Sequence, residues 1–369
     1  MLLQRYLHNK KPFKILDRYI IGKFLGTYIF AIILILAITV MFDVNEKLDA
    51  FLKAPLKATL FDYFLNFLPY FANQFSPLFT FIAVIFFTSK LADNSEIIAM
   101  LSSGMSFRRL MRPYLVSAAV IACCTYVLSA YIIPPANVKR INYTNTYVKN
   151  RRVDYGSNIQ MQVKKGEIAF MARYDNTTKT GVKFSLESFD KNKKLVSRLT
   201  AQTIHYDTLH RWQVRDYMIR DFKGSIEKIT RGSRLDTTIA MEPRDFLISK
   251  NDQETMSTPD LSGYITRQKA RGVANIKNFE IEYHRRFAMT AAAFILTVIG
   301  MSLSSKKVKG GMGVNIGIGL VLSFSYILFM TVTSTFSVSG YTSPMVAMWI
   351  PNIIYFVIAV VLYRKASRG

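Results

Sequence analysis

The distribution of apolar residues constrains the fold of this chain more than any other feature. Six long apolar runs form two groups of three, at 26–42 (extending back to 19), 61–88 and 114–133, and then at 287–303, 314–336 and 345–363. Each run approaches the ~20 residues with which an α-helix crosses the hydrocarbon core of a bilayer. Buried helices of a soluble protein are the alternative, which six runs of this length disfavour. The pattern predicts six transmembrane helices with one large polar insertion between the third and the fourth.

The basic residues predict the orientation of these helices. Lys and Arg are concentrated in four segments, at 5–23, 90–112, 306–309 and 364–368, whereas the loops 43–60 and 337–344 contain fewer of them. Because short cytoplasmic loops carry the excess of positive charge, both termini are predicted to be cytoplasmic and the insertion to lie outside. The insertion is itself basic. An anionic partner such as phosphorylated lipid headgroups, or simply a solvated surface, would account for this charge.

The insertion shows the pattern of β-structure. Residues 159–163 alternate between apolar and polar side chains, Lys164–Gly166 supplies a turn, and the alternation resumes over 168–172. Similar short runs occur near 184, 204 and 212, and their spacing favours a sandwich or jelly roll. A soluble enzyme domain is the competing interpretation, but no catalytic constellation is visible. We expect an all-β jelly-roll-like domain with connecting segments over 134–284, between membrane regions at 1–133 and 285–369.

The sequence contains no motif that would make this chain an enzyme. No G-x-x-x-x-G-K-[ST] phosphate loop is present, and the glycine-rich stretch at 309–313 is better explained as a tight turn. No metal-ligand cluster and no catalytic residue are predicted. Cys123 and Cys124 are adjacent within the third apolar run, and the insertion has no cysteine, so that redox chemistry is not expected.

Two pairs of residues are weaker candidates for function. Gly313 and Gly317 form a small-xxx-small pair at the start of the fifth run, which favours close helix packing or a movable seam between helices. Lys47 and Lys53 follow the first run on the outer side, where they would contact lipid phosphates or extend from the bilayer to water.

The loop between the second and third runs is the most informative local segment. At about 93–104 it predicts a short cytoplasmic helix in which Asn94 is the N-cap, Glu96 complements the helix dipole and Gly104 ends the helix. Its other predicted members are apolar: Ile97, Ile98, Ala99 and Leu101. Such a helix would dock into a groove on a cytoplasmic partner, or it would simply be a capped loop helix. The sequence pattern alone does not decide between the two.

The whole chain resembles the LptF/LptG family of lipopolysaccharide-export permeases. The order of three spans, an outer β-domain and three spans is similar to that family. The Asn94-x-Glu96-x-x-Ala99 segment with Gly104 resembles its coupling helix. Ile133-Pro134-Pro135 after the third span and Glu282-Tyr283-His284-Arg285-Arg286 before the fourth also resemble family sequence.

The resemblance implies a mechanism and a set of partners. Two paralogous permeases would pair with a dimeric cytoplasmic ABC ATPase, which would bind ATP and Mg²⁺, while this chain would bind no cofactor. Lipopolysaccharide would enter a shared cavity from the outer leaflet of the bacterial inner membrane, between span one of one permease and span five of the other. It would leave along the periplasmic β-domain toward bridge proteins of the LptC/LptA type.

Two further function classes compete with this expectation. A membrane-anchored β-domain that acts as a scaffold or assembly protein would need no ATPase. A secondary transporter would show an internal repeat and polar residues at mid-membrane, and neither feature is evident in the sequence.

Overall fold

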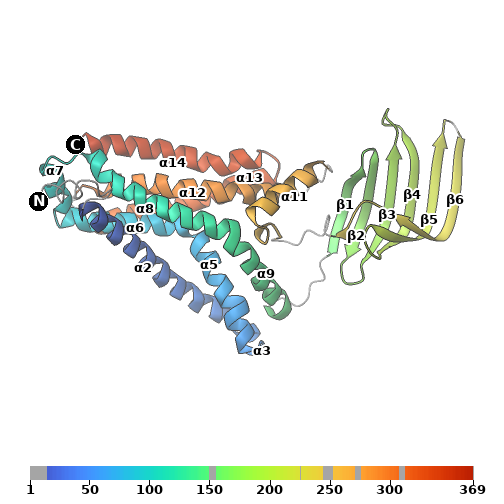
Figure 1. Ribbon diagram of the computed structural model, residues 1–369, viewed down its shortest axis with the longest axis horizontal. Helices are drawn as coiled ribbons and strands as arrows, with labels where there is room; N and C mark the ends of the chain where they lie inside the picture. The colour runs from blue at the N-terminus through green and yellow to red at the C-terminus, as the bar shows by residue number, and fades with distance from the viewer. Residues whose placement is uncertain are drawn as a thin grey trace, which may run out of the picture. The chain divides into compact units, whose positions relative to one another are not determined.

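The computed structural model describes residues 15–148, 155–224, 226–243, 252–270, 276–306 and 312–368. The chain forms two compact units, one made of residues 1–148 and 280–369 and the other of residues 149–279. The first unit is helical and the second contains a β-sheet (Figure 1).

The prediction of six membrane helices is confirmed. Within the described residues, six helical segments have the length and composition to cross a membrane. They are α2 (Ile15–Glu46), α6 (Ser76–Asp93), α8 (Phe107–Val127) with its continuation to Val148, α12 (Lys277–Ser304), α13 (Met312–Val338) and α14 (Pro344–Ser367).

The second span differs from the apolar run that predicted it. Instead of one helix over 61–88, the chain forms α3 (Leu48–Lys53), α4 (Leu56–Ala58), a π-helical turn η1 (Thr59–Phe64) and α5 (Leu65–Gln74), and α6 begins only at Ser76. Pro77 lies in the first turn of α6. A proline is tolerated there because that N–H would have no partner in the helix. The hydrophobic run is therefore two helices, of which the second is the candidate span.

The third helix continues past the predicted boundary of the β-domain at 134. After α8 come a π-helical segment η2 (Leu128–Ile132), α9 (Ile133–Tyr143) and a second π-helical segment η3 (Thr144–Val148). Pro134 and Pro135 lie in the first turn of α9. Since a proline cannot donate to the carbonyl four residues earlier, the wider π-helical turn accommodates both prolines without ending the helix.

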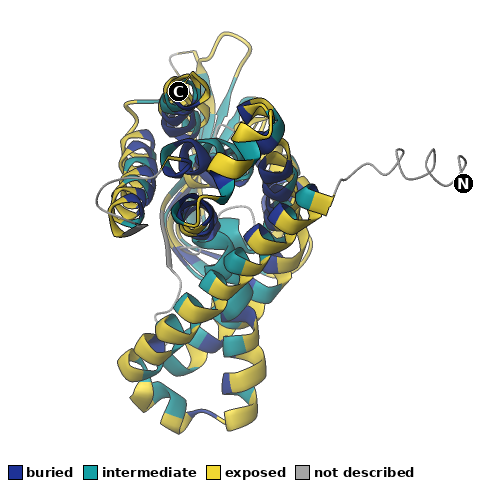
Figure 2. Cartoon of the chain, turned by 90° about the vertical axis from the view of Figure 1, so that its left-hand side faces the viewer, coloured by how far each residue is buried: buried dark blue, intermediate teal, exposed yellow. Residues whose placement is uncertain are grey.

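Helix α6 is the buried centre of the helical unit. In the most apolar 18-residue stretch of α6, 78% of the residues are buried, whereas in that of α2 only 6% are buried. Figure 2 shows α2 as a long, mainly exposed helix. Helices α2 and α13 both pack on α6. A Cβ atom added at Gly300 on α12 would lie 2.8 Å from Val84 Cγ1 of α6, and one at Gly319 on α13 would lie 2.2 Å from Ile85 Cδ1. Glycine at these two positions allows the close approach of both helices to α6.

The second unit contains one antiparallel sheet whose strands pair in sequence order. Its strands are β1 (Tyr155–Lys164), β2 (Glu167–Asp175), β3 (Thr180–Phe189), β4 (Leu195–Tyr206), β5 (Arg211–Lys223) and β6 (Ile226–Thr238). The predicted all-β class, the alternating strands and the turn before Gly166 are confirmed. One face of the sheet carries a buried core that includes Met171, Tyr174 and Trp212, and the indole Nε1 of Trp212 donates to the Met241 carbonyl at 3.0 Å.

A row of residues that interrupts the strand pairing crosses all six strands. Along this row the pairs on both sides keep a single register, and the residues in the row are Asn158, Ala172, Lys183, Gln202, Asp216 and Ser233. Three of them, on alternate strands, have a positive φ between 50° and 52°: Asn158, Lys183 and Asp216. We call this row the crease.

The crease shifts the alternation of side chains by one residue. Met171 and Tyr174 are both buried although they are three residues apart on β2, and Ala201 and Ile204 repeat this spacing on β4. In a regular strand, residues on one face are separated by two positions. The shift keeps the apolar side chains of both halves of the sheet on the same face.

Two helical segments follow the sheet in sequence, η4 (Asp252–Glu254) and α11 (Thr258–Ala270). The Ser257 Oγ caps the start of α11, because it accepts a hydrogen bond from the Asp260 backbone N–H at 3.3 Å. The ring centroid of Tyr264 on α11 lies 4.7 Å from that of Phe279 at the start of α12.

The contact at Gly300 predicts a pair of variants with different stabilities. Gly300→Val should destabilise the chain, because the added carbons meet a stiff β-branched side chain and overpacking costs roughly 1–3 kcal/mol. Gly317→Val is the matched control, since no atom lies within 4 Å of a Cβ built there. Thermal unfolding of the purified chain in detergent measures both. Equal stability of the two variants would contradict the role of Gly300 in packing.

Burial of Tyr174 predicts a loss of stability at alkaline pH. Burial, assisted by the nearby Tyr206 and Asp175, raises the pKa of the Tyr174 phenol to about 12. The unfolded phenol ionises at about 10. The contribution of Tyr174 to stability is therefore constant below pH ~10 and is lost as the pH rises toward 12. Ultraviolet titration of phenolate should show a late-ionising tyrosine that disappears in Tyr174→Phe; an unchanged titration curve would argue against this assignment.

Candidate functional site

Helix α7 (Glu96–Ser102) connects α6 to α8 and is the best candidate for a partner-binding element. It lies at the end of the helical unit where α14 also ends (Figure 1). The helix occupies the predicted segment but is shorter. Gly104 has a φ of 85° and its N–H donates to the Leu101 carbonyl at 3.0 Å, as expected for a residue that follows a helix end.

The predicted N-cap of this helix is wrong. Asn94 is the C-cap of the preceding helix α6, and Ser95, with a φ of 64°, occupies the N-cap position of α7 without a side-chain capping bond. The Asn94 side-chain amide instead donates to Glu96 Oε1 at 3.2 Å. Because α6 extends to Asp93, one residue in left-handed conformation makes the turn between the two helices, and Asn94 is not available to cap α7.

The apolar residues of α7 do not share one face. Ile97 is 1% exposed and packs in a core with Leu110 and Met111 of α8, whereas Ile98 is 52% exposed. Adjacent residues on an α-helix are separated by about 100°, so these two side chains point in different directions. Ile97 anchors α7 to the bundle, and Ile98 with the exposed Ala99 forms the surface that a partner would contact.

Two polar contacts connect α2 to this region, and the sequence reasoning missed both. The Tyr19 hydroxyl donates to Glu96 Oε2 at 3.3 Å. Arg109 Nη2 of α8 forms an ion pair with Asp17 Oδ2 of α2 at 2.6 Å, and the Asp17 side chain is almost fully buried. The one available signal was an acidic residue at position 17 within a basic segment. Through these contacts α7, α8 and the start of α2 form one connected end.

The outer faces of α2 and α13 are lined with exposed apolar side chains. They include Phe30, Ile33 and Met41 on α2 and Val321, Phe324 and Leu328 on α13. The predicted pair Gly313 and Gly317 is also exposed, and no atom of the chain lies within 4 Å of a Cβ built at either residue. Within this chain close helix packing uses Gly319 instead, so a role of Gly313 and Gly317 against another chain stays a prediction.

The two predicted lipid-contacting lysines are in different environments. Lys47 forms an ion pair with Asp43, and its Nζ donates to the Tyr63 hydroxyl at 2.6 Å. The ammonium also lies 5.9 Å from the centre of the Phe67 ring. Lys53, at the end of α3, is exposed. The charge of Lys47 is therefore paired within the helical unit, and the two lysines do not form one site.

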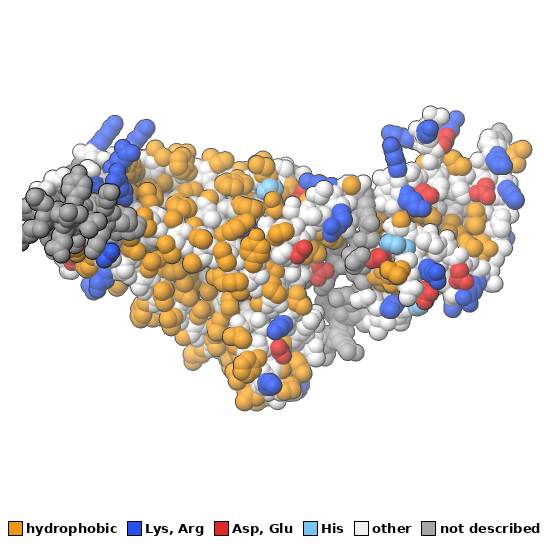
Figure 3. Space-filling view, viewed as in Figure 1, with side chains coloured by type: hydrophobic (Ala, Val, Ile, Leu, Met, Phe, Trp, Pro, Cys, Tyr) orange, Lys and Arg blue, Asp and Glu red, His pale blue; other side chains and the backbone are white. Residues whose placement is uncertain are grey.

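Charge is distributed unevenly along the helical unit. Figure 3 shows apolar side chains over most of the visible surface of the helices, with Lys and Arg side chains gathered at one end. Arg18, Lys90, Arg108, Arg112, Arg364 and Lys365 all belong to helix ends on this side. Among the residues that the structure describes, no group of three or more His, Cys, Asp and Glu side chains could hold a metal ion.

Comparison with known proteins identifies a family. Residues 18–365 match the family described as the lipopolysaccharide export system permease LptF/LptG, which covers the chain from α2 to α14. No curated protein matches the chain.

The ion pair between Arg109 and Asp17 predicts that the effects of removing the two residues are not additive in a double-mutant cycle. Asp17→Ala and Arg109→Ala should each lower the free energy of unfolding, and the effect of the double variant should be smaller than their sum by roughly 0.5–3 kcal/mol, because each single variant already loses the pair. Chemical or thermal unfolding in detergent gives the three values. Strict additivity would show that the pair contributes nothing to stability.

Proposed function

The chain belongs to the LptF/LptG family of lipopolysaccharide export permeases, and we propose that it is one of two permease subunits that extract lipopolysaccharide from the outer leaflet of the bacterial inner membrane. A separate ATPase would supply the energy, and a periplasmic bridge would receive the lipid. The chain is a multi-pass membrane protein. Its charge distribution supports cytoplasmic termini and a periplasmic β-domain.

The observation that carries this proposal is the arrangement of α2 and α13 around α6. Both helices pack on α6 and direct their other faces outward. Lipid alone would cover such faces, but the open pair Gly313 and Gly317 favours the close approach of a helix from a second chain. Pairing with a paralogous LptF/LptG-type permease would place α2 of one subunit near α13 of the other and enclose a cavity for the lipid.

Helix α7 is the proposed contact with a dimeric ABC ATPase. The sequence has no phosphate loop, so ATP and Mg²⁺ would be bound by the partner and this chain would carry no cofactor. Ile98 and Ala99 offer an exposed surface beside Glu96. Because Glu96 accepts a hydrogen bond from Tyr19 on α2, a displacement of α7 would be transmitted to the helix that lines the cavity.

The sheet supports transfer to a bridge protein of the LptC/LptA type. In the described residues β1 and β6 each pair with a single neighbour, so each offers one open edge. An added strand would satisfy the backbone groups at such an edge. The continuous apolar face of the sheet would accompany the acyl chains of the lipid.

Photocrosslinking in membranes tests the cavity. A photoreactive residue at Phe30 on α2 or Phe324 on α13 should crosslink to lipopolysaccharide in the assembled transporter, and ATP turnover should reduce the yield. Val357, exposed on α14, is the matched control and should give no lipopolysaccharide adduct. Equal adducts at all three positions, or purification of the chain without an ATPase, would favour a scaffold without transport.

Glu96 is expected to transmit the movement of the ATPase. Glu96→Ala should weaken ATPase association or uncouple ATP hydrolysis from export, because truncating one partner of a desolvated polar contact costs roughly 2–5 kcal/mol. Co-purification of the ATPase and lipopolysaccharide release in proteoliposomes measure the two effects.

Tyr19→Phe separates two causes of such a defect. It removes the hydrogen bond from α2 but keeps the carboxylate of Glu96. If Glu96 binds the ATPase directly, Tyr19→Phe should retain the ATPase, although export becomes slower. Normal association and normal export in Glu96→Ala would refute the role of this residue.

A further inference from the structure

An apolar cavity opens between α8, α12 and α14, on surfaces that the proposed lipopolysaccharide path does not use. Its volume is about 550 Å³, within the range of small-molecule sites. The apolar part of its lining comes mainly from Met111 and Leu115 on α8, Phe294 and Val298 on α12, and Phe356 on α14. We call it the α8–α12–α14 groove.

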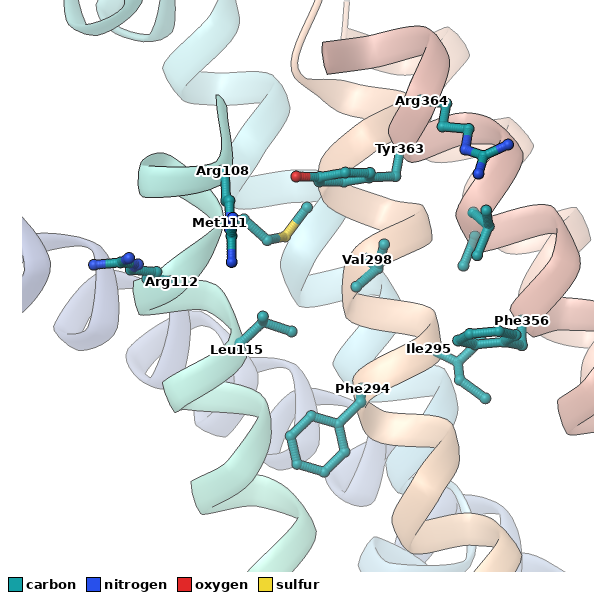
Figure 4. A pocket seen from close by; sticks show the side chains of 12 residues that line it. Arg108, Met111, Arg112, Leu115, Phe294, Ile295, Val298, Phe356, Tyr363 and Arg364 are labelled. Carbon is teal, nitrogen blue, oxygen red and sulfur yellow. The ribbon is translucent and has the colours of Figure 1, made fainter. Parts of the chain in front are cut away.

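Three arginines line the groove, all toward one end. Arg108 and Arg112 lie in the first two turns of α8, and Arg364 lies in the last turn of α14. In Figure 4, the ring of Tyr363 reaches across the groove toward Arg108, Arg364 lies beyond Tyr363, and Phe294 lies at the opposite, uncharged end, whereas the guanidinium of Arg112 points away from the groove. The groove therefore has a cationic mouth and an apolar interior.

The positive charge at the mouth is not balanced by the surrounding helices. Arg108, Arg112 and Arg364 form no ion pair with any residue in the described part of the chain, whereas their neighbour Arg109 is paired with Asp17. A second hollow beside Arg364 is lined by Lys365 and Arg368, which adds to the positive charge. An anion at the mouth would be attracted by guanidinium groups from two helices.

The dimensions of the groove suit a lipid. From Arg364 to Phe356 the rise along α14 is about 12 Å at ~1.5 Å per residue. An anion without an apolar body, such as free phosphate, would leave this apolar length unfilled. Basic pockets between helices on the cytoplasmic side of a membrane are suited to anionic lipid headgroups.

We propose that the α8–α12–α14 groove binds an anionic phospholipid of the cytoplasmic leaflet, with its phosphate at the mouth between Arg108 and Arg364 and an acyl chain along Phe294 and Phe356. The assignment to this leaflet rests on the orientation in the proposed function. Lipopolysaccharide does not fit this site in that orientation, because its phosphates lie at the outer surface. The bound lipid would join α8, which follows the ATPase-contacting helix, to the last helix of the chain.

Native mass spectrometry of the purified full-length chain, delipidated and then supplied with defined lipids, tests the proposal. Phosphatidylglycerol should be retained and phosphatidylcholine should not, and inorganic phosphate alone should not displace the lipid. Arg108→Gln/Arg364→Gln should lower the affinity about 30-fold, which corresponds to ~2 kcal/mol at ~1.4 kcal/mol per factor of ten. Arg18→Gln/Lys23→Gln removes equal charge from the same end on α2 and should leave retention unchanged.

A third variant distinguishes the groove from general surface attraction. Val298→Phe keeps every arginine but fills the apolar interior, and it should also abolish retention. Thermal unfolding confirms that the variants are folded. Equal loss in both charge variants, or full retention in Val298→Phe, would overturn the proposal. Labelling of Arg368→Cys in intact cells tests the orientation independently, so that a failure of the proposed topology is distinguishable from a failure of lipid binding.

Discussion

The close packing of α12 and α13 on α6 is the contact on which the rest of the helical unit depends. In a bilayer the lipid is as apolar as the side chains, so helices associate through close contact and hydrogen bonds rather than through the hydrophobic effect. Gly300 and Gly319 bring two helices against Val84 and Ile85. With α6 held inside, α2 and α13 both rest on it and leave their opposite faces for another chain or for lipid.

Hydrogen bonds between buried polar side chains supplement this packing. Asn352 of α14 donates to the Ala288 carbonyl of α12 at 2.8 Å and accepts from the Tyr326 hydroxyl of α13 at 2.9 Å, which connects three helices at one residue. At the start of α12, the buried Arg286 is paired with Glu282 at 3.0 Å. These buried polar groups each have a hydrogen-bond partner. Such partners are needed because burying an unpaired polar group costs free energy.

The sequence predicted the features that depend on contact with water or lipid. Hydropathy located the membrane helices, and alternation located the strands, because each pattern records which side chains meet water or lipid. The sequence did not predict the features that depend on which side chains lie beside one another in the folded chain. The outward direction of Ile98 and the use of Gly319 rather than Gly317 follow from packing against α6 and α8. The contacts of Lys47 with Asp43 and Tyr63 were likewise not predicted from the sequence.

The crease has a consequence for the apolar face of the sheet. Because the pairs on both sides of it keep one register, every strand passes through the crease without sliding along its neighbour. A strictly alternating sheet would turn the apolar side chains of one half to the opposite face, so the crease is what allows this six-stranded sheet to present a single apolar face along its whole length.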